Sequence, residues 1–165
     1  MEKYIFTRRG YEALIKLIKK IEGILKQTIK AKAEAGSGQD GWHDEGFKIG
    51  VSEEMMWSQR LGELEELCRN AEVIEPIEQN EFVNLGTGVI LKYENGETSK
   101  FILEGYNVEG FEGRLSIHSP LGQAIWGAKK GERRYLRIGK NEKMVTIQEI
   151  LPPSKAEGLI ANCEQ

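Results

Sequence analysis

The segment SGQDGWHDEGFKIG, residues 37–50, carries the side chains most able to do chemistry. It holds three acids, a tryptophan and a histidine between glycines, and helix-like sequence lies on both sides. Carboxylate oxygens are the ligands that a hard ion such as Mg²⁺ takes, so Asp40, Asp44 and Glu45 are candidate metal ligands. His43 is a candidate transition-metal ligand or proton shuttle, although such a histidine is more often simply solvated.

Simpler structural explanations of the same residues also stand. Asp44 and Glu45 fit the N-cap and first turn of a following helix, where the helix dipole favours negative charge. Adjacent helical residues point about 100° apart, so these two carboxylates chelate one ion comfortably only within a turn. Trp42 has little to bury against in a turn, which favours contact with a partner; folding back onto Phe47 is equally consistent.

Helical spacing on both sides predicts that two long antiparallel helices position this segment. Apolar residues recur with alternating spacings of four and three, the heptad pattern of a coiled coil. The expected N-cap is Thr7, although Gly10 weakens the first turn. At about 1.5 Å per residue, roughly 28 residues span about 42 Å, with residues 39–47, the hairpin tip, at the far end. The seam residues are Leu14, Ile18, Ile21, Leu25 and Thr28, then Trp57, Leu61, Leu64, Cys68 and Ala71.

The two predicted helices carry opposite charge. Residues 8–35 contain eight Lys or Arg and three acids, whereas residues 44–75 contain nine acids and three basic residues. Pairing between antiparallel helices explains this asymmetry, at a few tenths of a kcal/mol per exposed pair. The alternative is that the basic surplus of the first helix faces a polyanion.

Beyond residue 77 the pattern changes to short strands. Strand-like runs flank Asn95-Gly96, a strong hairpin signal, and further runs follow around one short helix that Ser119 and Pro120 begin. The predicted fold class is α+β: a helical hairpin domain over residues 1–77, a small α+β domain over 78–153, and a disordered tail over 154–165. Trp126 is expected in the core of the second domain.

The composition excludes several classes of protein. The chain has 165 residues, of which 39% are hydrophobic and 30% charged, and no apolar run approaches the roughly 20 residues of a membrane span. Its first residues lack the apolar core of a secretion signal, which predicts a cytoplasmic location. Its two cysteines do not form a disulfide framework.

Two segments, RNAEVIEP (69–76) and LSIHSPLGQAIWGAKKGE (115–132), resemble the bacterial GreA/GreB transcript-cleavage factors. The resemblance extends from Thr7 to Leu151. It implies a coiled-coil hairpin followed by a domain similar to FK506-binding proteins. It further implies that the second domain docks on RNA polymerase while the hairpin enters the secondary channel. Acidic tip residues then help hold a catalytic Mg²⁺ shared with the polymerase active site, and the polymerase cuts its own backtracked RNA.

The tip also departs from the family pattern, which reads Gly-Asp, two residues, then Glu-Asn-Ala-Glu-Tyr. Aligned on Gly41, Trp42 stands at the aspartate position and Glu45 at the glutamate position, and residues 46–49 replace the rest. Glu45 therefore carries over as a catalytic and metal-holding residue. Asp44 is inferred to supply the missing carboxylate, and Asp40 is the alternative if the loop is remodelled.

The resemblance also assigns a candidate polymerase-binding loop. Ser119 and Pro120 match the family's docking loop, and His118 stands where Asp or Asn is common. Trp42 is the fourth candidate polymerase contact. A helix start is sufficient to explain Ser119 and Pro120. A basic cluster is a candidate contact with nucleic acid or acidic polymerase surface, although a solvated strand face explains most of it: Lys129, Lys130, Arg133, Arg134 and Arg137.

Three functions are consistent with the sequence. The first is a transcription elongation factor, an accessory factor and not an enzyme, that stimulates RNA cleavage. The second is a non-cleaving regulator or inhibitor that occupies the channel with its altered tip. The third is a peptidyl-prolyl isomerase or peptide-binding module, for which the candidate pocket residues are Phe82, Tyr93, Phe101, Tyr106, Phe111, Trp126 and Tyr135. We expect the protein to be a monomer that contacts no membrane. It is expected to meet nascent RNA and DNA only within the elongation complex.

Overall fold

The computed structural model describes residues 3–38, 45–107 and 112–161, in two units. The hairpin unit is Glu12–Ala71, and the sheet unit combines Lys3–Tyr11 with the chain from Glu72 onward. This division differs from the expected boundary after residue 77. The short strands β1 (Tyr4–Phe6) and β2 (Ala71–Val73) pair with each other, so the start of the chain joins the sheet unit.

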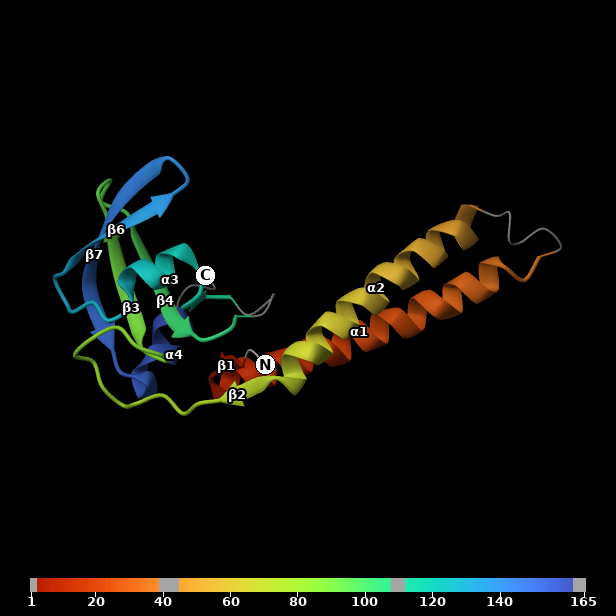
Figure 1. The fold of residues 1–165 in the computed structure, drawn as a ribbon, viewed down its shortest axis with the longest axis horizontal. Coiled ribbons are helices and arrows are strands. Elements are labelled where there is room, and N and C mark those ends of the chain that lie inside the picture. The colour runs from red at the N-terminus through yellow and green to blue at the C-terminus, as the bar shows by residue number, and fades with distance from the viewer. Residues whose placement is uncertain (1–2, 39–44, 108–111, 162–165) are drawn as a thin grey trace. The chain divides into compact units, whose positions relative to one another are not determined.

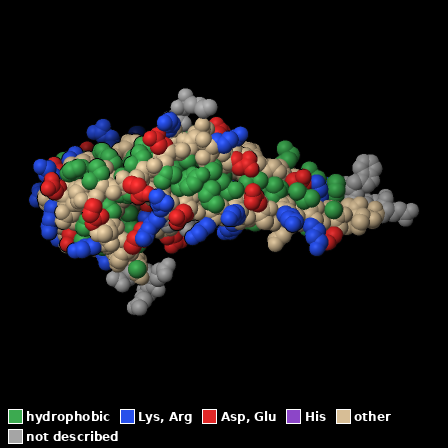
Figure 2. Space-filling view, turned by 90° about the horizontal axis from the view of Figure 1, so that it is seen from below, with side chains coloured by type: hydrophobic (Ala, Val, Ile, Leu, Met, Phe, Trp, Pro, Cys, Tyr) green, Lys and Arg blue, Asp and Glu red, His purple; other side chains and the backbone are tan. Residues whose placement is uncertain are grey.

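The hairpin unit is built from α1 (Arg8–Ala35) and α2 (Glu45–Arg69), which lie side by side (Figure 1). Its predicted seam is confirmed at Leu14, Ile21 and Leu64, which are buried. The Lys32 ammonium pairs with Glu54 across the two helices, one instance of the expected interhelical charge pairing. Hydrophobic side chains also remain exposed among charged ones along the hairpin (Figure 2), including Ile29, Ile49, Val51, Met55 and Met56.

Close approach of the two helices requires a glycine at position 50. A Cβ built on Gly50 lies 2.8 Å from Cβ and 3.3 Å from Cα of Lys32. We expect Gly50→Ala to lower the free energy of unfolding by about 1–3 kcal/mol, because the helices must separate. Gly62→Ala is the matched control, since its Cβ meets nothing within 4 Å. Alanine there should stabilise the helix by up to about 1 kcal/mol. Urea unfolding measures the free energy of unfolding of both variants. Equal changes in the two variants would contradict the close approach of the helices at Gly50.

The sheet unit contains five strands in the order β5-β4-β3-β7-β6. Neighbouring strands are antiparallel except for β4 and β5, which run parallel. The Asn-Gly turn connects β3 and β4 as predicted, and Gly96 adopts a φ of 86° there. The elements are β3 (Gly88–Tyr93), β4 (Thr98–Glu104), β5 (Arg114–Ser116), α3 (Pro120–Ile125), β6 (Arg133–Ile138), β7 (Asn141–Leu151) and α4 (Pro153–Ala161).

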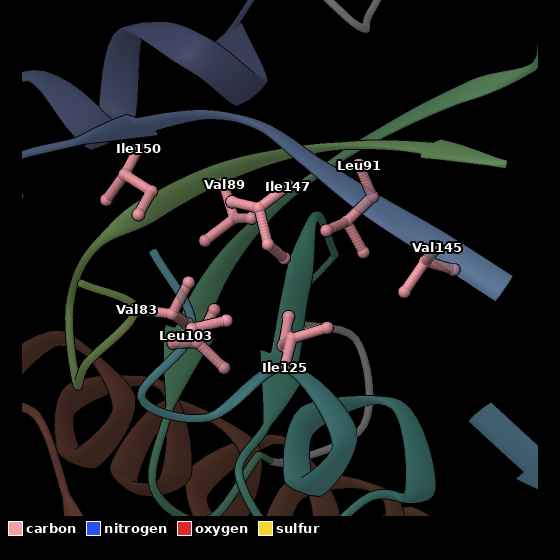
Figure 3. Close-up of a cluster of buried hydrophobic side chains, with 9 residues drawn as sticks. Val83, Val89, Leu91, Leu103, Ile125, Val145, Ile147 and Ile150 are labelled. Atoms are coloured by element: carbon pink, nitrogen blue, oxygen red, sulfur yellow. The ribbon is translucent and has the colours of Figure 1, made fainter. Parts of the chain in front are cut away.

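A hydrophobic core lies between the sheet and α3 (Figure 3). Alternate residues of β3 and β7 point into it, as the two-residue period of strands requires. Ile125 of α3 completes it from the opposite side. The buried cluster is Val83, Val89, Leu91, Leu103, Ile125, Ala128, Val145, Ile147 and Ile150.

The tail was predicted to be disordered, and this prediction is wrong over residues 154–161. Pro153 occupies the first position of α4, where proline fits a helix. Ala156 and Leu159 are buried, because they cover Gly88 on the sheet face opposite α3. A Cβ on Gly88 would lie 3.2 Å from the Cα of Ala156. A short apolar stripe is therefore enough to order this segment when it packs against a sheet.

The core prediction for Trp126 is also wrong. Its side chain is 42% exposed, because Trp126 is the C-cap residue of α3 and its backbone leaves the helical conformation. The core position at this end of the helix belongs to Ile125. Among the described residues, no helix combines the length and apolarity that crossing a membrane requires.

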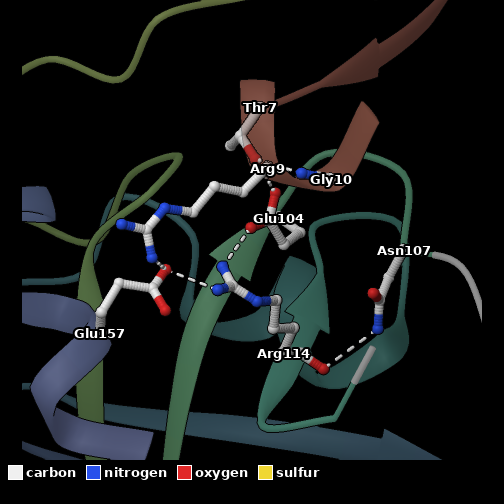
Figure 4. Close-up of polar contacts among 7 residues, drawn as sticks. All are labelled: Thr7, Arg9, Gly10, Glu104, Asn107, Arg114 and Glu157. Atoms are coloured by element: carbon white, nitrogen blue, oxygen red, sulfur yellow. Dashed lines mark hydrogen bonds and ion pairs between the residues drawn. The ribbon is translucent and has the colours of Figure 1, made fainter. Parts of the chain in front are cut away.

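A buried polar network joins Thr7, the first turn of α1, β4, β5 and α4 within the sheet unit (Figure 4). Glu104 accepts hydrogen bonds from the Thr7 hydroxyl at 2.6 Å and from the Arg114 guanidinium at 2.5 Å. Arg114 and Arg9 both pair with Glu157 of α4. Burial raises the pKa of the Glu104 carboxyl, whereas the hydrogen bond from Thr7 and the charge of Arg114 oppose this.

The same network explains the glycine in the first turn of α1. Thr7 caps the helix as predicted, since its Oγ1 accepts a hydrogen bond from the Gly10 N–H at 3.0 Å. A Cβ on Gly10 would lie 3.1 Å from Oε2 of Glu104, a tight contact. Gly10 therefore lets the carboxylate reach the helix start.

Candidate functional site

Glu45 is the part of the tip site that the structure describes. It is the first residue of α2, which confirms its predicted place in an acidic first turn. Its side chain is 82% exposed, and its Oε2 lies 3.8 Å from Nζ of Lys48. An exposed pair at this distance contributes little energy, so the carboxylate is available to an ion or a partner. Asp40, Trp42, His43 and Asp44 lie outside the described residues.

The last residue of the tip, Phe47, is closely packed against the end of α1. A Cβ on Gly36 would lie 2.9 Å from the Phe47 ring, so this ring rests against the end of α1. Ser37 follows the helix, and its hydroxyl donates to the Glu34 carbonyl at 2.7 Å. The ring of Phe47 is therefore half-buried against its own hairpin.

The donor chemistry of the tip suits a hard ion. A glutamate oxygen is an appropriate ligand for Mg²⁺, which binds one or two carboxylates and keeps several waters. Within the described ranges, no three His, Cys, Asp or Glu side chains form a group that could hold a metal. The exposed Glu45 carboxylate is one suitable ligand, and Asp40 and Asp44 remain predicted contributors.

The predicted docking loop is hydrogen-bonded around Ser119. Its hydroxyl donates to the Ser116 carbonyl at 2.7 Å and accepts from the Gly122 N–H at 3.0 Å, which makes it the N-cap of α3. His118 and Pro120 are exposed beside it. The His118 ring lies 6.4 Å from that of Tyr106, measured between centroids. The loop thus presents His118 and Pro120 outward while Ser119 holds their backbone in place.

Ser119→Ala should lower the free energy of unfolding of the sheet unit by about 1 kcal/mol, because α3 loses its N-cap. For a unit of this size, this corresponds to a Tm about 4–8 °C lower. Thermal unfolding followed by circular dichroism measures the change. His118→Ala serves as the control, since its exposed side chain should leave Tm within about 2 °C of the wild type. A Tm unaffected by Ser119→Ala would show that the cap is not important for stability.

A cavity of about 550 Å³ opens at one end of the sheet. It lies between the β3–β4 and β6–β7 hairpins and is lined by Tyr93, Leu121, Leu136 and Ile138 together with several polar residues. Of the described aromatic residues considered for an isomerase pocket, Tyr93 is the one that lines this cavity. Tyr135 is 64% exposed on the opposite sheet face. The candidate aromatic residues that the structure describes therefore do not converge on this cavity.

The sequence analysis did not identify the Glu104 network. One signal was present: Glu104 is a lone acid at the end of the apolar run Phe101-Ile102-Leu103. An acid in a buried strand needs a partner, and Arg114 supplies it from the neighbouring strand. The spacing of the two residues along the chain gave no indication of this pairing.

Comparison with known proteins places the chain in a family. Residues 78–152 match the family model described as "Transcription elongation factor, GreA/GreB, C-term". Transcription elongation factor GreA of Thermotoga maritima is 34% identical over 138 residues, which cover 80% of this chain and 86% of that protein. The chain belongs to the GreA/GreB family of transcription elongation factors. GreA of Paracoccus denitrificans is 30% identical over 156 residues, covering 91% of this chain and 100% of the relative.

Solved structures of similar proteins include Gfh1, GreA factor homolog 1, of Thermus thermophilus. Gfh1 is 24% identical to this Gre-family chain, with a TM-score of 0.44. The match covers 90% of this chain and 99% of the Gfh1 chain. The GreA/GreB factor of Nitrosomonas europaea is 18% identical and gives a TM-score of 0.38.

Proposed function

We propose that this Gre-family chain binds bacterial RNA polymerase and stimulates cleavage of backtracked RNA. The observation that carries the proposal is the exposed carboxylate of Glu45 at the first position of α2, at the far end of a long two-helix hairpin. Such a hairpin is narrow enough to deliver an acid into a confined active site. The chain acts as an accessory factor, and the polymerase supplies the remaining catalytic groups.

The tip residues would act together in this function. Glu45, with Asp44 or Asp40, would donate carboxylate oxygens to a Mg²⁺ held in the polymerase active site. When bound, this ion activates water for phosphodiester hydrolysis. The hairpin's own contribution is to position the carboxylates, and the loop at His118, Ser119 and Pro120 would dock the sheet unit on the polymerase.

A purified, backtracked elongation complex tests the proposal. Adding the chain at physiological Mg²⁺ concentration should shorten the RNA from its 3′ end, and elongation should restart from the new end. A chain carrying His118→Ala and Pro120→Ala should need a higher concentration for the same cleavage rate, because docking is weakened. Binding without shortening would refute the cleavage function, and absence of binding would refute the proposal as a whole.

A second function is supported by Trp42, which stands where the family pattern has an acid. A bulky ring in place of a carboxylate suits a regulator that occupies the channel and slows nucleotide addition. In that case no RNA shortening occurs, and Trp42→Ala restores the rate of nucleotide addition. The same elongation complex therefore distinguishes the two functions.

A further inference from the structure

The sheet face opposite the hydrophobic core is only partly covered by α4. Gly88 and Ile102 on this face are buried beneath the helix. Farther along the strands, exposed side chains of β3, β4 and β6 alternate with buried ones. We define the uncovered sheet face by the exposed basic and aromatic residues on this side of the sheet, Lys92, Lys100, Arg133, Tyr135 and Arg137.

The strand register brings cations from distant parts of the sequence into one row. Arg133 of β6 is opposite Thr146 of β7, which is opposite Lys92 of β3. Two steps between strands separate Arg133 from Lys92 by about 10 Å. Lys92 and Lys100 are diagonal neighbours on β3 and β4, about 7–8 Å apart. The side chains of Lys and Arg are long enough to reach across these distances.

Positive charge dominates this face, although the whole chain carries a net charge of −3. Two carboxylates share it, those of Glu142 and Glu149 on β7. Glu142 lies 3.7 Å from Arg137 and partly neutralises it. Among the described residues, no ion pair engages Lys92, Lys100 or Arg133. Unneutralised cations in a row attract a chain of negative charges.

Tyr135 adds an aromatic surface to the row. It stands between Arg133 and Arg137 on β6, and its side chain is 64% exposed. Exposed aromatic rings beside cations on a sheet are the arrangement by which proteins stack bases and hold phosphates of single strands. An acidic protein surface would satisfy the cations but would leave this ring without a specific role.

We propose that the uncovered sheet face binds single-stranded RNA, with Tyr135 stacking on a base and Arg133, Lys92 and Lys100 contacting phosphates. RNA is the occupant because elongation factors work where RNA is being made. The proposal rests on family membership and on this face, and it does not depend on tip chemistry. Its test therefore uses free RNA without polymerase, so its failure is distinct from failure of the cleavage function.

The experiment measures fluorescence anisotropy of a labelled, unstructured 12-nucleotide RNA with the full chain at several salt concentrations. Tyr135→Ala should weaken binding about 5- to 160-fold, the loss of one stacked base. The double variant Arg133→Ala/Lys92→Ala should reduce the slope of log K against log salt concentration by about 1.4, since each single-strand phosphate contact contributes about 0.7. Duplex RNA of the same sequence should bind at least tenfold more weakly.

The matched control is Lys16→Ala/Lys19→Ala, which removes the same charge from α1. It should leave affinity within about twofold and the salt slope unchanged if the sheet face is the binding site. Equal losses in both double variants, or no binding by the wild type, would overturn the proposal. Tighter binding of single-stranded DNA than of RNA would overturn the choice of RNA. If the wild type binds no RNA and the sheet variant loses polymerase binding, the face would instead be a contact site for an acidic protein surface.

Discussion

Glu45→Ala is expected to reduce the rate of RNA shortening in a backtracked elongation complex by about 100-fold or more. Loss of a residue that only hydrogen-bonds a metal ligand typically lowers metal affinity or activity about 10- to 100-fold. Glu45 is proposed to contact the ion itself, so its loss should have at least this effect. The measured quantity is the single-turnover rate of appearance of the shortened RNA. Because a lost ligand weakens ion binding, raising the Mg²⁺ concentration should restore part of the rate.

Glu53→Ala is the matched control for this prediction. Glu53 is an exposed carboxylate on the same helix, so its removal changes the hairpin charge equally. Cleavage and polymerase affinity should both remain within about twofold of the wild type, as for an ordinary surface position. Affinity should also be unchanged in Glu45→Ala, measured by competition for polymerase. Undiminished cleavage by Glu45→Ala would remove this carboxylate from the mechanism.

Asp44→Ala separates the two explanations of the tip acids. If Asp44 supplies the second carboxylate, Asp44→Ala should lower the cleavage rate as strongly as Glu45→Ala does. The stability of the helix should then change by no more than the contribution of an N-cap, about 1 kcal/mol. If Asp44 is only a cap, cleavage should persist at full rate while the hairpin unfolds at a lower temperature. Asp40→Ala tests the remodelled-loop alternative, since it should lower the cleavage rate only if Asp40 supplies the second carboxylate.

The features that sequence predicted well depend on local periodicity. The seam from Leu14 to Thr28 follows a heptad, and the strands around Asn95-Gly96 follow a period of two, so both could be read within short windows. The N-cap roles of Thr7 and Ser119 are local as well, since each hydroxyl binds an N–H three residues ahead. Of the candidate metal ligands at the tip, the structure describes Glu45, and it confirms that residue's place in the first turn of α2.

The features that sequence missed depend on contacts between distant segments. The stripe of Ala156 and Leu159 is too short to be stable alone, and it is ordered because Gly88 leaves room for it on the sheet. Trp126 looked like a core residue because aromatic rings usually are, but the helix ends there. The partners Glu104 and Glu157 are 53 positions apart, and both reach Arg114 only once β4, β5 and α4 are assembled.

The Glu104 network gives the second large expected effect, on stability. Glu104→Ala should lower the free energy of unfolding of the sheet unit by about 3–5 kcal/mol, because it leaves the Arg114 guanidinium buried with half of its compensating charge. The side chains of Glu104 and Arg114 are 1% and 4% exposed, so water cannot replace the lost partner. Urea unfolding followed by circular dichroism measures the change. Glu142→Ala, which breaks the exposed pair with Arg137, should cost less than about 1 kcal/mol.

A double variant distinguishes loss of the pair from loss of packing. Replacing both partners, Glu104→Leu with Arg114→Met, removes the buried charges together and should be less destabilising than Glu104→Ala alone. In a cycle with the single variants Glu104→Leu and Arg114→Met, the expected coupling between the two positions is about 1–3 kcal/mol, the range for groups in one buried network. Additive effects would mean that the two charges do not depend on each other. In that case the network would act mainly by filling space between the first turn of α1, β4 and α4.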